Sequence, residues 1–406
     1  MNQRHVHPWV FMVLIIPFGA QSGYAGVTLA YQLKAAGVTV ATVVAVSSLS
    51  ILPQTWKFFW GPLVDITLTQ KKWCVISIFL TGLGTAMLGF FPATNAGLTA
   101  LRLIVFTSSL ASTFSAMAID NIIAHSVPDE LRGHASGWYQ AGNLGGYGLG
   151  GGLGLLLADK LHSPWLASLV VGGLCLPCCL VLLLLPSIGK TVHESTLLRS
   201  LGATLKDFWH LVSARAGLLV FVLSFLPIGT ASAPFPVVSD EWHASAKTVA
   251  YVSGVLGGLV AAAGCVVGGW ACDRMDRKSA YVWFGIAQAA SAIAMALLPR
   301  TEVMFTAWVL IYTFTSGLCY AAFFAFVFEA IGAGAAATKC TAIVSLSNVP
   351  IYYMANVDGW AFDHWKSGKA MLFTEAACAF GAGILFLVLA RILLPPRTAA
   401  PAPVPV

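Results

Sequence analysis

The sequence predicts an all-α polytopic membrane protein, with twelve transmembrane helices arranged as two six-helix halves. Two observations predict this fold class: the composition, and a loop signal that occurs once in each half. Hydrophobic residues make up 58% of the chain and charged residues 9%, with a mean hydropathy of +0.82. Such a composition leaves too few polar side chains to cover a soluble protein. The chain is therefore expected to lie in a lipid bilayer.

The apolar segments have the length of membrane-spanning helices. A helix needs about 20 apolar residues to cross roughly 30 Å of hydrocarbon. Segments of this kind lie at 8–33, 38–59, 73–91, 98–124, 135–157 and 165–185, and again at 218–238, 248–268, 280–298, 304–328, 341–360 and 370–390. They are apolar on every side, whereas the strands of a membrane barrel alternate apolar and polar residues. A helical bundle is therefore preferred to a barrel.

A polar stretch between the sixth and seventh spans divides the chain. We predict an N-terminal six-helix bundle at 1–186, a cytoplasmic linker at 187–215, a C-terminal six-helix bundle at 216–394 and a disordered tail at 395–406. Fourteen of the 22 basic residues fall on the linker side of the membrane and six on the other side. Lysine and arginine are retained on the cytoplasmic side of short loops. We therefore expect an inner (plasma) membrane protein with both termini in the cytoplasm.

A glycine followed four residues later by an aspartate ends the second span and recurs at the end of the eighth. The first copy contains Gly61 and Asp65, and the second contains Gly269, Asp273, Arg274 and Arg277. A carboxylate at a helix end, beside basic groups, can form a charge lock that stabilises one conformation and breaks in another. We assign these residues to a conformational gate. The alternative is that they are the solvated ends of helices.

Other acids repeat at nearly the same offset, Asp120 with Glu329 and Asp159 with Asp363. Two six-helix halves related in this way resemble the major facilitator superfamily, and the second loop copy resembles the loop motif of that superfamily. The first copy departs from it, with Ile66 where arginine is expected. The resemblance implies a secondary transporter that holds its solute between the two halves.

A second resemblance begins inside the second span. The run Lys57-Phe58-Phe59-Trp60-Gly61-Pro62-Leu63-Val64-Asp65 resembles a signature of AmpG-like muropeptide permeases and of their relatives, the acetyl-coenzyme A transporters. The run Pro128-Asp129-Glu130-Leu131-Arg132-Gly133 is similar to the loop after their fourth span, although His125 stands where they often carry a second acid. The resemblance implies proton-coupled import of an amphipathic small solute, such as a muropeptide or siderophore, by alternating access.

Charged residues inside spans are costly and usually functional. Lys57 lies eight residues before Asp65, and Asp120 lies eight residues before Pro128. Both therefore lie roughly 12 Å inside the same end of their helices, a depth that permits an ion pair. The pair is either structural, or Asp120 exchanges its partner or its proton during transport. We assign Lys57, Asp120 and Glu329 to proton coupling, while Glu329 is alternatively a wetted helix end.

Polar and aromatic residues within the spans are the candidates for solute binding. They are Gln21, Tyr24, Gln54, Arg102, Gln140, Asn143, Tyr147, Thr230, Tyr312, Tyr320, Asn348 and Tyr352. Each can also bond to a neighbouring helix instead of a solute. Arg102 either extends to the interface or binds a carboxylate or phosphate in the cavity. The glycines of the fifth span serve either close helix packing or a flexible gate. As a set, the candidates suit an amphipathic solute.

The sequence contains no enzyme signature: there is no phosphate-binding loop, no His-Glu-x-x-His motif and no nucleotide-binding domain. We expect no cofactor, with a proton gradient as the energy source, and no metal, since Cys175, Cys178 and Cys179 lie in an apolar span without histidine. The expected partners are a small-molecule solute and the bilayer, with no nucleic acid, and we expect a monomer. The alternatives are an exporter or antiporter of acyl-CoA-like or drug-like solutes, or a receptor or scaffold that does not transport.

Overall fold

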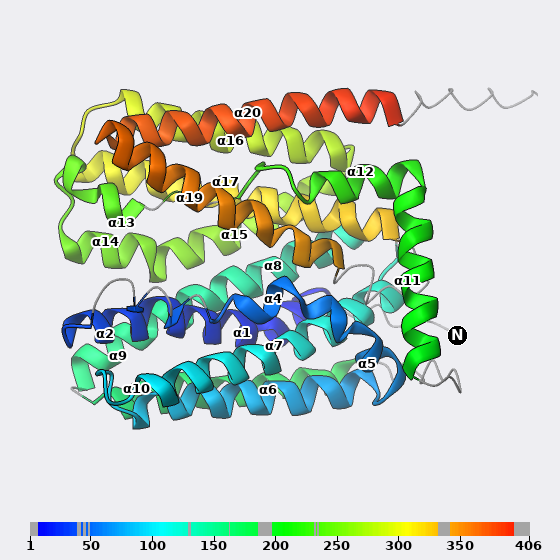
Figure 1. The fold of residues 1–406 in the computed structure, drawn as a ribbon, viewed down its shortest axis with the longest axis horizontal. Helices are drawn as coiled ribbons and strands as arrows, with labels where there is room; N and C mark the ends of the chain where they lie inside the picture. The colour runs from blue at the N-terminus through cyan, green and yellow to red at the C-terminus, as the bar shows by residue number, and fades with distance from the viewer. Residues whose placement is uncertain are drawn as a thin grey trace, which may run out of the picture.

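The computed structural model describes residues 7–38, 42–43, 46–47, 49–128, 131–161, 163–185, 197–230, 233, 235–331 and 342–393. Figure 1 shows the helices up to α10 as one bundle and those from α12 to α20 as a second bundle beside it. Helix α11 (Leu197–Ser213) lies across one end of the molecule, which we call the linker end. The predicted tail and residues 187–196 of the predicted linker lie outside the described residues.

The N-terminal bundle consists of α1 (Trp9–Gly23), η1 (Tyr24–Leu29), α2 (Ala30–Ala35), α4 (Leu52–Thr55), η2 (Lys57–Phe59), α5 (Gly61–Ile66), α6 (Gln70–Met87), η3 (Leu88–Phe90), α7 (Leu98–Ser126), α8 (Arg132–Gly148), η5 (Leu149–Leu153), α9 (Gly154–Leu161), α10 (Pro164–Cys175) and η6 (Leu176–Leu184). The C-terminal bundle consists of α12 (Arg215–Leu223), α13 (Phe235–Val238), η7 (Ser239–Trp242), α14 (Ala246–Ser253), α15 (Val255–Cys272), α16 (Arg277–Leu297), α17 (Glu302–Ile331), α19 (Asn348–Trp365) and α20 (Gly368–Leu393).

Eight described helices are long and apolar enough to cross a membrane. They coincide with the predicted spans one, three, four, six, eight, nine, ten and twelve. The other four predicted spans are interrupted or more polar. Span two is broken at Trp56, span seven loses its helix after Leu223, span eleven has a turn at Ser347, and span five carries Gln140 and Asn143. Irregular backbone at membrane depth is tolerated only inside protein or along a cavity. These four spans are therefore where a binding site is expected.

Helix α8 lies where the two bundles meet, between α1 of its own bundle and α15 of the other (Figure 1). Glycines permit both contacts. A Cβ atom at Gly142 would lie 2.1 Å from the carbonyl oxygen of Met12, and one at Gly148 would lie 2.7 Å from the Cα atom of Gly258. Small residues let membrane helices approach closely. The glycines of span five thus serve helix packing on two sides.

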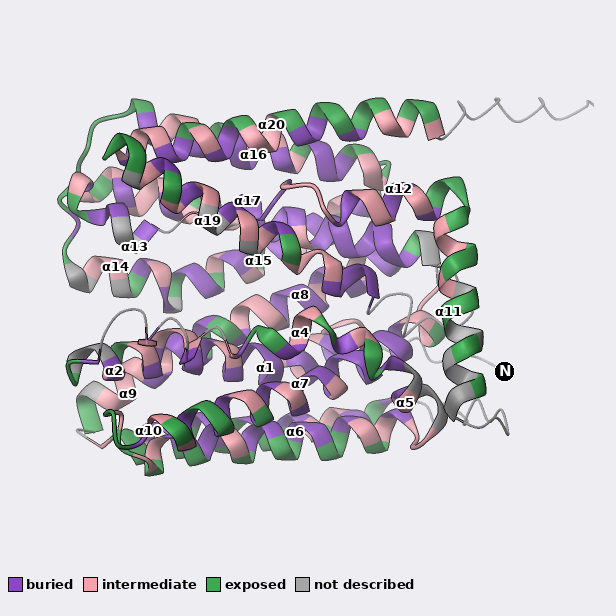
Figure 2. Cartoon of the chain, in the orientation of Figure 1, coloured by how far each residue is buried: buried purple, intermediate pink, exposed green. Residues whose placement is uncertain are grey.

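The outer faces of the bundles are apolar. Figure 2 shows exposed positions along the outward sides of α6, α10 and α20, and these include Phe79, Leu174 and Ile384. An exposed apolar surface of this kind suits a protein whose solvent is lipid. Helix α11 differs, because it exposes Lys206 beside Leu205 and Trp209. A helix with one charged and one apolar side suits the membrane interface.

Candidate functional site

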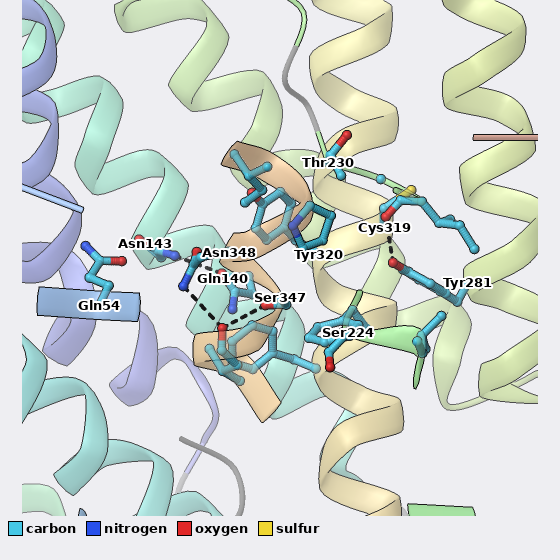
Figure 3. Close-up of a pocket in the computed structure, with 18 of the residues that line it drawn as sticks. Gln54, Gln140, Asn143, Ser224, Thr230, Tyr281, Cys319, Tyr320, Ser347 and Asn348 are labelled. Carbon is cyan, nitrogen blue, oxygen red and sulfur yellow. Dashed lines mark hydrogen bonds between the residues drawn. The ribbon is translucent and has the colours of Figure 1, made fainter. Parts of the chain in front are cut away.

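A cavity lies between the two bundles (Figure 3). The N-terminal bundle lines it with Phe18, Gln54, Lys57, Tyr139, Gln140 and Asn143. The C-terminal bundle lines it with the stretch that follows α12 and with residues of α16, α17 and α19. All four of the interrupted or polar spans contribute to this lining. The irregularities in the fold are therefore concentrated where a solute can be held.

The backbone of span seven leaves the helix at the cavity and is held by side chains of neighbouring helices. Tyr281 on α16 donates its hydroxyl hydrogen to the carbonyl oxygen of Ile228, at 2.6 Å. Tyr353 on α19 donates likewise to the carbonyl oxygen of Phe225, at 2.8 Å. Gly229 has a φ of +70°, which L side chains rarely adopt. Carbonyl groups freed from the helix are in this way satisfied away from water.

Amide side chains form one wall of the cavity. The Nδ2 atom of Asn143 donates to Oε1 of Gln140 at 3.0 Å, and Nε2 of Gln54 donates to the carbonyl oxygen of Ser50 at 3.2 Å. The Nε2 atom of Gln140 is buried and has no hydrogen-bond partner among the described residues. A buried donor without a partner carries a desolvation cost. A solute oxygen in the cavity would relieve that cost.

Aromatic side chains form the other wall. The rings of Tyr139 and Phe324 lie 5.6 Å apart between centroids, and those of Tyr281 and Phe323 lie 5.9 Å apart. Tyr320 lies one turn before Phe324 on α17 and also lines the cavity. Aromatic faces of this kind pack against apolar or sugar-like surfaces. The lining of the cavity therefore combines hydrogen-bonding groups with aromatic rings.

Lys57 and Asp120 provide the buried charges beside this cavity. Lys57 is 3% exposed and lines the cavity, while Asp120 on α7 is 1% exposed and is not among the lining residues. The charge of Lys57 and the hydroxyl group of Tyr139 both act on Asp120. Neither carboxylate oxygen of Asp120 has a hydrogen bond of normal geometry among the described residues. The structure thus brings Lys57 and Asp120 near each other, and of the two only the lysine lines the cavity.

The predicted solute-binding residues divide into two groups. Those that line the cavity are Gln54, Gln140, Asn143, Thr230, Tyr320 and Asn348. Gln21 instead donates to Ser108 Oγ at 3.1 Å, Tyr24 is fully buried, and Arg102 and Tyr147 are exposed outside the cavity. Tyr312 bonds to Glu375. The side chain of Tyr352 lies outside the described part of the chain.

Sequence reasoning missed several lining residues. Ser224 and Tyr281 line the cavity, as do Phe323 and Phe324 on the turn that follows Tyr320. The sequence does contain a signal near Ser224, because Pro227 and Gly229 follow it by three and five residues. Proline and glycine at these positions predict a break in span seven. No comparable signal marks Tyr281, because its role depends on a backbone carbonyl of another span.

The linker end of the two bundles is held together by hydrogen bonds between them. Asp273, at the end of α15, accepts from the backbone N–H groups of Gly133 at 2.8 Å and of His134 at 3.0 Å, and from the His134 side chain. These N–H groups begin α8, where the helix dipole favours a negative charge. Arg132 also donates to the carbonyl oxygen of Phe328 at 2.9 Å, and Ser136 to that of Ala321 at 2.7 Å.

The remaining gate candidates lie around this contact. A Cβ atom at Gly269 would lie 2.4 Å from the carbonyl oxygen of Gly133, so the contact requires glycine. Arg277 lies 3.9 Å from Asp273 and pairs with Glu329 at 3.2 Å, which places Glu329 at the linker end. Arg274 stacks on the ring of Trp270. In the first copy Gly61 is buried, and the side chain of Asp65 is not described. In the described part of the chain, no three metal-ligating side chains come together.

Comparison with known sequences places this arrangement in a known class. Residues 9–351 match the family model described as "Major Facilitator Superfamily". The anhydromuropeptide permease of Escherichia coli strain K12 is 28% identical over 350 residues, which cover 83% of this chain and 70% of that protein. The protein of the same name from Escherichia coli O157:H7 gives the same values.

Solved structures share the fold at low sequence identity. A single-residue variant of the Escherichia coli fucose:proton symporter FucP has a TM-score of 0.72 and 15% identity, with 95% of this chain and 99% of that chain covered. The human organic anion transporter MFSD10 has a TM-score of 0.69 and 15% identity, with 95% and 100% covered. The predicted all-helical two-bundle fold is confirmed by these likenesses.

Proposed function

Because the chain belongs to the major facilitator superfamily, whose members are membrane transporters and not enzymes, we propose that it imports an amphipathic small solute of the muropeptide class, driven by a proton gradient. The observation that carries this proposal is the cavity between the bundles, which combines one buried lysine, a wall of amides and a wall of aromatic rings.

The chemistry of a sugar-peptide matches the three parts of the cavity. Sugar rings offer apolar faces to Tyr139 and Phe324, while hydroxyl and acetamido groups can accept from the amide of Gln140. A carboxylate of the peptide is the anion that Lys57 would bind. The similarity to the anhydromuropeptide permease supports this solute class. A simple ion would leave most of this surface unused.

Coupling would arise from competition for Lys57. When Asp120 is ionised, it holds the lysine, and when Asp120 takes up a proton, the lysine is released toward an anionic solute. Binding of the solute and binding of the proton then favour each other. Lys57 lies at the cavity surface and Asp120 does not, which suits this order of contacts. Glu329, paired with Arg277 at the linker end, would act on the gate rather than on the solute.

Alternating access would require the linker end to open and close. In this structure it is closed by the contacts of Asp273 and Arg132 with the opposite bundle. The excess of basic residues on the linker side supports a cytoplasmic location for this end. We therefore assign the structure to the stage in which solute enters from outside the inner membrane. Breaking these contacts would let the bundles rock and release the solute inside.

Uptake in proteoliposomes tests the proposal. A labelled anhydromuropeptide should accumulate when the outside is made acidic, and a protonophore should abolish the accumulation. Unlabelled anhydromuropeptide should compete, whereas acyl-coenzyme A and a siderophore should not. Uptake that only equilibrates would overturn the coupling, and competition by acyl-coenzyme A alone would overturn the solute class. The absence of uptake of all three, by protein of normal thermal stability, would favour a receptor or scaffold.

A further inference from the structure

Two buried acids lie in the C-terminal bundle, away from the cavity. Asp358 on α19 is 0% exposed, and Glu375 on α20 is 6% exposed. Neither is among the lining residues of the cavity. The hydroxyl of Tyr312 on α17, itself buried, bonds to Oε1 of Glu375. Helix α19 packs against α20, and Asp358 acts electrostatically on both Glu375 and Tyr312. Three helices thus contribute two carboxyl groups and one phenol to one buried region inside the membrane, where charged groups are costly and usually functional.

The two carboxylate oxygens of Glu375 differ in their hydrogen bonds. Oε2 of Glu375 is buried and has no hydrogen-bond partner among the described residues. An ionised carboxylate needs donors around both of its oxygens, whereas a protonated one carries its own O–H group. Among the residues that the structure describes, Tyr312 is the donor to Glu375, and one donor suits a protonated acid better than an ion.

The ionisable groups around Glu375 also bear on whether this acid holds a proton. The groups that act on Glu375 are Asp358, of like charge, and the hydroxyl of Tyr312. Cys378, one turn further along α20, faces the same two acids. Helices α12 and α16 also pack against α20, and their ionisable groups are Arg215, Arg277, Lys278 and Tyr281, in the first turns at the linker end. Like charges in a medium of low dielectric disfavour the ionisation of both carboxyl groups at once.

The cluster lies at a depth that a proton can reach from the end opposite the linker. Asp358 is seven residues from the end of α19, and Glu375 is seven residues from the start of α20. At 1.5 Å per residue, both lie roughly 10 Å inside that end. Helices α17 and α19 then continue to the cavity, where they present Tyr320 and Ile351. A change at the cluster can therefore move helices that also touch the solute.

We propose that Glu375 and Asp358 form a second proton-binding site, in which the two carboxyl groups share one proton and Tyr312 positions Glu375. The proton enters while the linker end is closed and stabilises the packing of α17, α19 and α20. Its loss leaves two like charges side by side and drives these helices apart. The role in transport rests on the proton coupling proposed above, whereas proton binding at the site does not.

Infrared difference spectroscopy on the purified protein tests proton binding without any solute. A pH step should change the C=O stretching band of a buried protonated carboxyl group. Glu375→Gln and Asp358→Asn should each remove or shift this band. Asp240→Asn, at an exposed acid of the same bundle, is the matched control and should leave it unchanged. A band that persists unaltered in both single variants overturns the proposal, as does a band that sodium ions displace at constant pH.

A third variant keeps the test decisive if the acid variants fold poorly. Tyr312→Phe retains both acids and removes only the hydroxyl that bonds to Glu375. It should move the pH at which the carboxyl band half-disappears. An unchanged titration in Tyr312→Phe overturns the proposed positioning of Glu375 and, with it, the site.

Transport separates this inference from the proposed function. In Glu375→Gln, gradient-driven uptake should fall roughly tenfold or more, while solute exchange at equal pH on both sides is retained. If the carboxyl band responds as expected but wild-type uptake ignores the proton gradient, the proposed coupling fails and the proton site stands. If uptake is driven by protons and Glu375→Gln leaves it unchanged, the coupling stands and this site has no part in it.

Discussion

The hydroxyl of Tyr281 on α16 donates a 2.6 Å hydrogen bond to the carbonyl oxygen of Ile228, in the non-helical stretch of span seven. Both residues line the cavity. The bond joins α16 to span seven through a carbonyl group that a continuous helix would have satisfied by itself. It therefore fixes the shape of the cavity and replaces the hydrogen bonding lost where the helix stops.

Tyr281→Phe should lower the stability of the protein, because the Ile228 carbonyl group stays buried without its donor. The expected loss is about 1–3 kcal/mol, visible as a lower melting temperature of the purified protein in detergent. Tyr251→Phe is the matched control, since Tyr251 is exposed. Equal melting temperatures for the Tyr281 variant and the wild type would contradict the role assigned to this bond.

Asp120→Asn should abolish gradient-driven uptake and leave solute exchange measurable. The amide occupies the space of the carboxyl group but cannot take up or release the proton. Counterflow in proteoliposomes without a gradient measures the exchange. Asp240→Asn, which removes an exposed acid elsewhere, should transport normally. Uptake by Asp120→Asn that still depends on pH as in the wild type would exclude Asp120 as the proton carrier.

Lys57→Met should fold poorly, because it leaves the charge of Asp120 buried without compensation, at a cost of about 3–5 kcal/mol. Combining it with Asp120→Leu should restore folding, since both charges are then absent. Melting temperatures of the two single variants and the double variant form a double-mutant cycle. A double variant as unstable as the sum of the singles would show that the two residues do not interact. Recovered transport in the double variant would make the pair structural only.

Asp273→Asn should shift the protein toward states with an open linker end, since the neutral amide binds the start of α8 more weakly. A loss of about 1.4 kcal/mol would change the population ratio tenfold. Distances between spin labels at positions 131 and 275, both exposed at this end, report the opening. Asp240→Asn removes an exposed acid elsewhere in the same bundle and should not change them. Should solute affinity fall with unchanged distances, Asp273 would belong to the binding site.

Gly269→Ala tests the same contact sterically, because the added Cβ atom would lie 2.4 Å from the carbonyl oxygen of Gly133. The linker end should then fail to close, and uptake should decrease while the protein remains folded. Gly173→Ala is the control, since nothing lies within 4 Å of a Cβ atom there. Normal spin-label distances in Gly269→Ala would mean that the helices can shift to accept a methyl group.

The fold was predictable because it follows from hydrophobicity and length, which do not depend on neighbours. The site was predictable in part. Gln54, Gln140 and Asn348 stand out as polar residues in apolar spans, and the structure places all three at the cavity. The same signal does not distinguish these residues from Gln21, whose side-chain amide donates a hydrogen bond to Ser108 on the neighbouring helix α7. Sequence shows that a polar group is buried, but not whether a cavity or a helix faces it.

Glu375 and Asp358 illustrate the other limit. Both acids can be seen in the sequence as charged residues within apolar spans, yet neither has a counterpart in the other half of the chain. Their significance depends on the packing of α19 against α20, which places them beside Tyr312. Likewise, the partner of Asp273 is a pair of backbone N–H groups in the opposite bundle. Nearly every residue has a backbone N–H group, so the sequence does not show which of them will bind Asp273.

The division of the spans into eight strongly apolar helices and four interrupted or polar ones also has a consequence for biosynthesis. A span enters the bilayer from the translocon when its apolar residues outweigh its polar ones. The eight apolar helices should insert on their own, whereas spans two, five, seven and eleven should need neighbours to retain them. Most of the residues that line the cavity lie in these four spans, and so most changes that adapt it to a new solute should fall there. A substitution that changes the specificity of this protein must therefore first leave these spans able to insert into the membrane. Only then can it affect solute binding by the folded protein.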